Sequence, residues 1–128
     1  MNKTISTLIF LFLSNYFAVY SQNKMGSIKG NVIENDRPVE FADVFITTQS
    51  DSTNIISGTN TDSLGRFIVD KIPFGNYILN IQFIGYVPVK TSVAITSSNH
   101  EIDLKSIEIK VDENVLQSVD VISFRKSI

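Results

Sequence analysis

Hydrophobic and polar residues alternate with a period of two along most of the chain after residue 25. The alternation begins at Ile28–Ile33 and is strictest at Tyr77–Phe83, where every second residue is large and apolar. Successive side chains of a β-strand point to opposite faces, so this period predicts strands with one buried face. No segment after residue 25 keeps a helical period over three turns. The pattern therefore predicts an all-β domain.

Short runs of turn-forming residues separate the predicted strands at roughly 8–12 residue spacing, which is typical of a β-sandwich of about seven strands. The clearest run is Thr61–Gly65, in which Asp62 can cap the backbone and Gly65 accepts the positive φ of turns that close hairpins. The segment Ile55–Asn60 is more polar than the other strands, so we expect it at the edge of a sheet.

The alternation changes phase near Ser106. Apolar residues fall on even numbers at Ile102 and Leu104, and on odd numbers at Ile107 and Ile109. This change predicts a β-bulge or a strand that passes from one sheet to the other.

Residues 1–21 have the pattern of a signal peptide. Lys3 gives the positive start, Leu8–Leu13 form the apolar centre, and the predicted cut lies between Ser21 and Gln22. A membrane anchor is the less favoured alternative, because a span needs about 20 apolar residues and polar residues interrupt this run. We therefore expect an exported protein.

The composition excludes most site chemistry. The chain of 128 residues has no Cys, one His and a net charge of −2. Disulfides, thiolate–metal sites and multi-histidine centres are excluded, and the acidic balance argues against nucleic-acid binding. His100 lies between two predicted strands without a legible nucleophile or orienting partner, so a solvated turn residue is favoured. We predict no enzyme, cofactor, metal site or catalytic residue.

Two weaker patterns deserve a test. Four loop aspartates could hold calcium, although their spacing matches no calcium loop: Asp36, Asp43, Asp51 and Asp62. Phe74 and Tyr86 lie at turns, and if exposed they are candidate ligand contacts for a sugar. Packing in the core remains the favoured explanation of the aromatic residues.

The turns and strands together resemble the carboxypeptidase regulatory-like domain, a transthyretin-like, immunoglobulin-like sandwich of seven strands. The residues that carry the resemblance are Gly30, Pro38, Ala42, Thr61, Asp62, Gly65, Phe67, Pro73, Gly75, Tyr77, Gly85 and Tyr86. The resemblance implies that they make turns and core contacts and take no part in catalysis. Hydroxyisourate hydrolases share this fold, but they need several His and Arg residues that this chain does not offer.

A second resemblance concerns the context. The signal-like segment, the domain at 22–112 and the tail at 113–128, with Leu116–Val121 in it, look like the start of a TonB-dependent outer-membrane receptor. This implies a periplasmic or outer-membrane location and a plug, barrel or associated envelope protein as partner. The sequence stops where the plug would begin, so we expect a truncated receptor product or a stand-alone domain without transport activity.

The prediction of function is a non-catalytic periplasmic interaction domain that docks a protein by adding a strand to an exposed edge. The candidate edges are Ile55–Asn60 and Val115–Val121. A carbohydrate-binding module, with a glycan at Phe74 or Tyr86, is the alternative.

Overall fold

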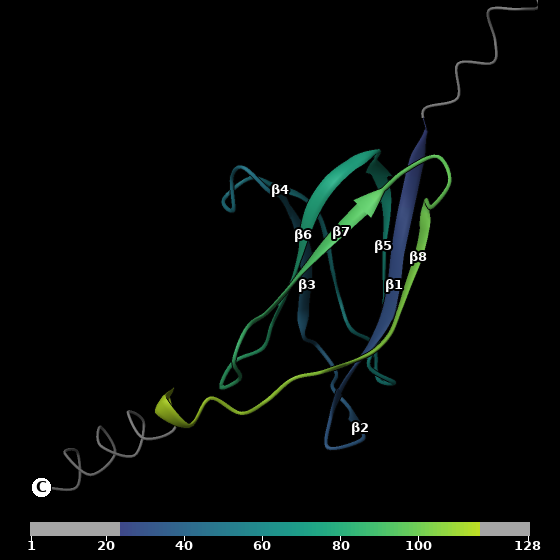
Figure 1. Ribbon diagram of the computed structural model, residues 1–128. Helices are drawn as coiled ribbons and strands as arrows, with labels where there is room; N and C mark the ends of the chain where they lie inside the picture. The colour runs from purple at the N-terminus through teal and green to yellow at the C-terminus, as the bar shows by residue number, and fades with distance from the viewer. Residues whose placement is uncertain (1–23, 116–128) are drawn as a thin grey trace, which may run out of the picture.

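The computed structural model describes residues 24–115, which form a β-sandwich of two four-stranded sheets (Figure 1). The strands are β1 (Met25–Glu34), β2 (Arg37–Pro38), β3 (Asp43–Thr48), β4 (Ile55–Asn60), β5 (Arg66–Pro73), β6 (Gly75–Gln82), β7 (Val89–Ile95) and β8 (Glu101–Glu108). The all-β sandwich predicted from the alternation is confirmed. The extra strand over the seven expected is β2, a two-residue strand that pairs with the end of β1.

The first sheet is built around β1. Strands β2 and β5 pair with β1 in antiparallel orientation, and β8 pairs with it in parallel. The register between β1 and β8 shifts between Lys29 and Asn31, opposite Lys105, whose φ is +59°. This is the irregularity that the phase change near Ser106 predicts, and β8 stays in one sheet through it.

The second sheet is antiparallel throughout, in the order β4-β3-β6-β7. The polar segment Ile55–Asn60 is the edge strand β4, as its composition predicts. Val44 opposes Ile81 and Ile46 opposes Leu79, so the apolar positions of β3 and β6 share the inner face.

The core lies between the two sheets and consists of the alternating apolar positions. Its fully buried large side chains include Ile28, Val32, Val44, Ile46, Val69, Ile72, Leu79, Ile81, Ile95 and Ile109. Each contributes about 1.5–3 kcal/mol by leaving water. Gly30 lies among them because a Cβ there would come within 2.9 Å of the Phe67 ring.

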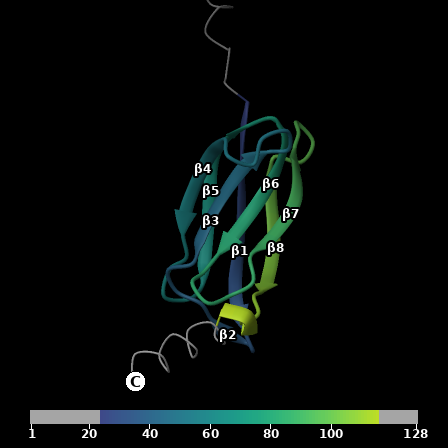
Figure 2. The same ribbon diagram turned by 90° about the vertical axis from the view of Figure 1, so that its left-hand side faces the viewer.

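Because successive strands run in opposite directions, the connections gather at two ends of the sandwich (Figures 1 and 2). The exit end carries residues 35–42, 61–65, 83–88 and 109–115, where the described chain ends. The entry end carries the start of β1, residues 49–54, Phe74 and residues 96–100.

One sequence prediction is wrong in detail, and a second is tested only at its first residue. The turn Thr61–Gly65 does not close a hairpin, because β4 and β5, which it joins, belong to different sheets. Residues 113–115 are helical, so the part of the proposed edge Val115–Val121 that is described is not a strand. The rest of that edge and the signal-like segment 1–21 lie outside the described residues. Between residues 24 and 115 no helix is long and apolar enough to cross a membrane.

Candidate functional site

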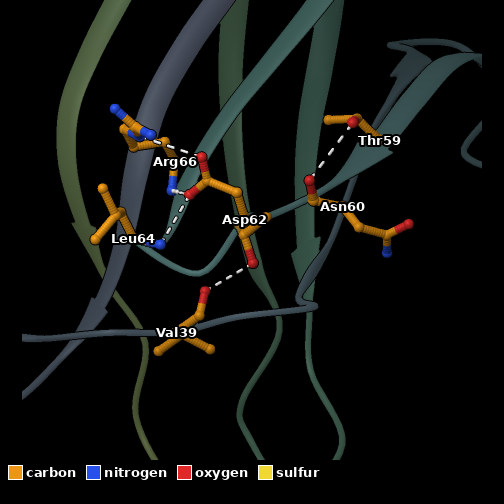
Figure 3. Close-up of polar contacts among 7 residues, drawn as sticks. Val39, Thr59, Asn60, Asp62, Leu64 and Arg66 are labelled. Atoms are coloured by element: carbon orange, nitrogen blue, oxygen red, sulfur yellow. Dashed lines mark hydrogen bonds and ion pairs between the residues drawn. The ribbon is translucent and has the colours of Figure 1, made fainter.

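The turn between β4 and β5 is organised by the carboxylate of Asp62 (Figure 3). Its Oδ1 accepts hydrogen bonds from the backbone amides of Leu64, at 3.0 Å, and Arg66, at 2.9 Å. Its Oδ2 lies 3.1 Å from Nε of Arg66. The amide of Arg66, more than any other group, lowers the pKa of Asp62 below its ordinary value of 3.8. The carboxylate therefore caps the turn, and its oxygens are already occupied by these donors.

Thr61, the residue before Asp62, ties this turn to the loop after β2. Its side chain is only 2% exposed. Its hydroxyl donates to the carbonyl oxygen of Val39 at 2.7 Å and accepts from the amide of Ala42 at 2.9 Å. One buried hydroxyl thus satisfies two backbone groups that the loop leaves without partners.

The other residues of the recognised pattern lie at corners and in the core. Gly65 has a φ of +73°, and a Cβ there would lie 2.5 Å from the carbonyl oxygen of Val32 and 3.2 Å from Cβ of Pro38. Phe67 and Tyr77 are buried, and the Tyr77 hydroxyl donates to the carbonyl oxygen of Pro73 at 2.7 Å.

Gly75 is the first residue of β6, and Gly85 lies in the turn after that strand. Gly75 has a φ of +159° and Gly85 a φ of +85°. The pattern residues are therefore spread over both ends of the sandwich, and they form no single cluster.

The outer face of the first sheet carries a hollow of about 750 Å³. Strands β1, β5 and β8 and the end of β4 line it with Lys29, Gly30, Asn31, Thr59, Asn60, Asp62, Arg66, Phe67, Ile68, Asp103, Lys105 and Ser106. Ile68 is 63% exposed among these mostly polar groups. Sequence reasoning missed this surface, because its residues come from strands far apart in the chain. Gly30, Asp62 and Phe67 are predicted only as turn and core residues, and the others read as ordinary solvent-facing positions.

Charges in the hollow are paired within short distances. Nζ of Lys105 lies 3.1 Å from Oδ2 of Asp103. The Lys105 amide is the main cause that lowers the pKa of Asp103, and the charge of Lys29 adds to it. The arrangement offers hydrogen bonds, two ion pairs and the further cation Lys29, which suits binding. A nucleophile with an orienting base is not found among its lining residues.

The β4 edge is the second candidate surface. The Thr61 amide donates to the Ala42 carbonyl, so the backbone groups of Thr61 point toward β3. Backbone direction alternates along a strand, and the groups of Gly58 and Asn60 therefore point away from β3. Ile55, at the start of β4, is 59% exposed. This edge combines unpaired backbone donors with an exposed apolar side chain.

The proposed aromatic pair does not form a platform. Phe74 precedes the eight-residue strand β6 at the entry end, and Tyr86 follows it at the exit end, so the length of the strand separates them. Both rings are partly buried against the core instead of standing free. Tyr86 lies 5.3 Å from Phe83 between ring centroids, and its hydroxyl donates to Oε2 of Glu34 at 2.5 Å. That bond is the main reason that the pKa of Tyr86 is raised above its ordinary value of 10.0.

The remaining polar candidates do not converge. His100 is exposed at the entry end, where its carbonyl accepts a bond from Ser27. Asp51 is also at the entry end, where its Oδ1 accepts hydrogen bonds from the amide and the hydroxyl of Thr53. Asp36 and Asp62 lie at the exit end. Over residues 24–115 no group of three His, Asp or Glu side chains is placed to hold a metal ion.

Comparisons with known proteins agree with this architecture. The sequence model of the family described as "CarboxypepD_reg-like domain" matches residues 28–121. No curated protein matches the chain. Among solved structures, the chain is similar to BcpA, the major pilin subunit of Bacillus cereus, at 16% identity and a TM-score of 0.56, covering 70% of this chain and 31% of the pilin.

Two further structures share the fold. The Bacillus anthracis TIE protein matches at 18% identity and a TM-score of 0.55, over 67% of this chain and 16% of that one. The 5-hydroxyisourate hydrolase of Klebsiella pneumoniae matches at 14% identity and a TM-score of 0.51, over 69% of this chain and 99% of the hydrolase. The chain thus spans less than a third of the pilin subunit, and likenesses at these identities concern the fold alone.

Proposed function

The chain belongs to the family of CarboxypepD_reg-like domains, and on that basis we propose that it is a non-catalytic interaction domain that docks another protein along the edge of β4. The observation that carries the proposal is the outward direction of the backbone groups of Gly58 and Asn60 at an exposed, polar strand edge. An extended segment of a partner can pair with such groups, while its alternate side chains set specificity.

The absence of catalysis is supported by the residue inventory. The chain has a single His and no Cys. His100 lies at the entry end and is not among the residues that line the hollow. The likeness to the hydrolase concerns the fold, and the chain lacks the set of His and Arg residues on which that reaction depends.

We further propose an envelope location, with the domain serving a TonB-dependent receptor. The support is the signal-like segment 1–21 and the resemblance of Leu116–Val121 to the segment that precedes a receptor plug. The partner would then be a plug, a barrel or an associated envelope protein. Glycan binding has less support, because Phe74 and Tyr86 lie at opposite ends and are partly buried.

The test is a capture experiment with two variants of one residue. Asn60→Pro removes the outward backbone N–H, and Asn60→Ala keeps it; both lose the side-chain bond from Asn60 to Asp43. The tagged chain is used to capture proteins from envelope extracts. We expect one protein to be retained by the natural chain and by Asn60→Ala and to be lost with Asn60→Pro. Equal retention by both variants, with unfolding midpoints alike, would refute docking at this edge.

A further inference from the structure

Exposed apolar side chains are concentrated at the exit end of the sandwich. Ten large apolar residues are exposed among those described, and six belong to the connections of this end: Phe41, Leu64, Ile84, Val87, Val111 and Val115. Ile84 is 91% exposed and Phe41 is 69% exposed. Single exposed apolar residues are ordinary, but such a concentration at one end marks an interaction surface.

One of these residues is held in a costly backbone conformation. Phe41 has a φ of +65°, in the left-handed region that non-glycine residues seldom adopt. Its amide donates to the carbonyl oxygen of Thr61 at 3.1 Å, and the Thr61 hydroxyl fixes the residues on both sides of it. The surrounding contacts thus impose the strain while the Phe41 side chain stays largely exposed within the described chain. Strain held in this way is found at functional positions.

Backbone pairing holds the other side of the exit end. The Val87 amide donates to the Lys110 carbonyl and the Asp112 amide donates to the Gly85 carbonyl, both at 2.8 Å. Tyr86 and Val111 face one another in the bridge between these bonds. Val87 and Val111 therefore belong to a fixed bridge, and Ile84 lies in the turn before it, which the Tyr86 amide closes by donating to the Phe83 carbonyl.

The exit end is also acidic. Apart from the ion pair of Asp62 with Arg66, its segments carry four carboxylates and two cations: Asp36, Glu40, Asp112 and Glu113 against Arg37 and Lys110. Glu34, the last residue of β1, adds a fifth carboxylate beside them. This excess of three negative charges exceeds the net charge of −2 of the whole chain. A second copy of the domain would bring the same charges to the contact and be repelled.

We propose that the exit end is a docking surface for a different protein, one whose contact surface is apolar with a rim of Lys or Arg. Phe41, Leu64 and Ile84 supply the apolar contacts, and the carboxylates around them favour a basic rim. This inference goes beyond the β4 edge, because none of these residues belongs to β4 and docking at either place can fail without the other.

The experiment is photo-cross-linking in the cells that naturally make the protein. A photoreactive residue replaces Ile84 at the exit end or, as the control, Met25, which is exposed at the entry end. The Ile84 adduct is then measured in Glu40→Lys/Glu113→Lys and in a matched reversal elsewhere, Asp70→Lys/Glu101→Lys. All four side chains are exposed. Unfolding midpoints establish that each variant folds.

We expect an adduct with another protein at Ile84 and none at Met25. The exit-end reversal should lower its yield at least threefold, the matched reversal should leave it unchanged, and the cross-linked peptide should contain Lys or Arg beside apolar residues. The proposal is overturned by absence of an adduct, by equal adducts at both positions, by linkage to the chain itself or a second copy, or by a yield insensitive to charge. Asn60→Pro, run in parallel, tests docking at the β4 edge.

Discussion

The hydroxyl of Thr61 lies 2.7 Å from the carbonyl oxygen of Val39 and donates to it across a sequence separation of 22 residues. The hydroxyl oxygen of Thr61 in turn accepts a hydrogen bond from the amide of Ala42. A single side chain just after β4 therefore fixes the loop that presents Phe41 to solvent. The stability of the domain and the shape of the exit end depend on the same buried hydroxyl.

Replacing Thr61 by Val removes both bonds while keeping nearly the same shape. Two buried backbone groups lose their partners, and each costs about 1–3 kcal/mol. We expect the free energy of unfolding in urea to fall by about 2–4 kcal/mol. Thr61→Ser keeps the hydroxyl and should lose less than half as much; equal losses in the two variants would show that the methyl group, and not the hydroxyl, matters.

Comparing Ala variants at Gly65 and Gly85 distinguishes the cost of backbone strain from that of a steric collision. Both have positive φ, at +73° and +85°, so Ala at either position is strained by about 1–2 kcal/mol. Only at Gly65 would the new Cβ collide, at 2.5 Å from the Val32 carbonyl oxygen, whereas nothing lies within 4 Å at Gly85. We expect Gly65→Ala to destabilise by at least about 2 kcal/mol more than Gly85→Ala. Similar urea midpoints for both variants would contradict the close approach.

The carboxyl of Asp62 should titrate below 3.8, because the Arg66 amide and then other donors favour its charged form. A group whose pKa is lowered by folding stabilises the fold above its unfolded pKa, and that contribution disappears as pH falls through the folded pKa. Stability should therefore decline below about pH 4. Carboxyl NMR of the natural chain measures the pKa directly, and Asp62→Asn should weaken the decline. A pKa at or above 3.8 would contradict the capped turn.

Tyr86 gives the opposite dependence at alkaline pH. Its hydrogen bond to Glu34 favours the neutral phenol and raises its pKa above 10.0. The contribution is present below the unfolded pKa and is lost as pH rises through the folded one. Ultraviolet titration of Glu34→Gln should show the Tyr86 pKa move back toward 10.0. An unchanged titration curve would mean that Glu34 does not hold this phenol.

Sequence patterns predict the local features of this fold well. The polar composition of Ile55–Asn60 is enough to place β4 at an edge, because a strand with little to bury cannot be central. The change of phase near Ser106 locates the bulge at Lys105 because a single extra residue reverses which positions face the core.

Features that depend on contacts between distant parts of the chain cannot be predicted from the sequence pattern. The turn at Asp62 has the residues of a hairpin turn, but β5 pairs with β1, whose paired residues lie 35 to 48 positions earlier in the chain, so the turn joins two sheets. The positive φ of Phe41 has no local signal such as Gly or Asn, since Thr61 imposes it from another strand. The hollow beside Ile68 likewise exists only after β1, β5 and β8 are assembled.

Amide hydrogen exchange along β4 tests the proposed function most directly. The amides of Ser57 and Thr59 share the direction of Thr61 toward β3, so they are protected in the free domain, whereas those of Gly58 and Asn60 point outward. When the captured envelope protein binds, we predict that exchange at Gly58 and Asn60 slows at least tenfold. Unchanged exchange at both amides in the saturated complex would contradict docking along this edge.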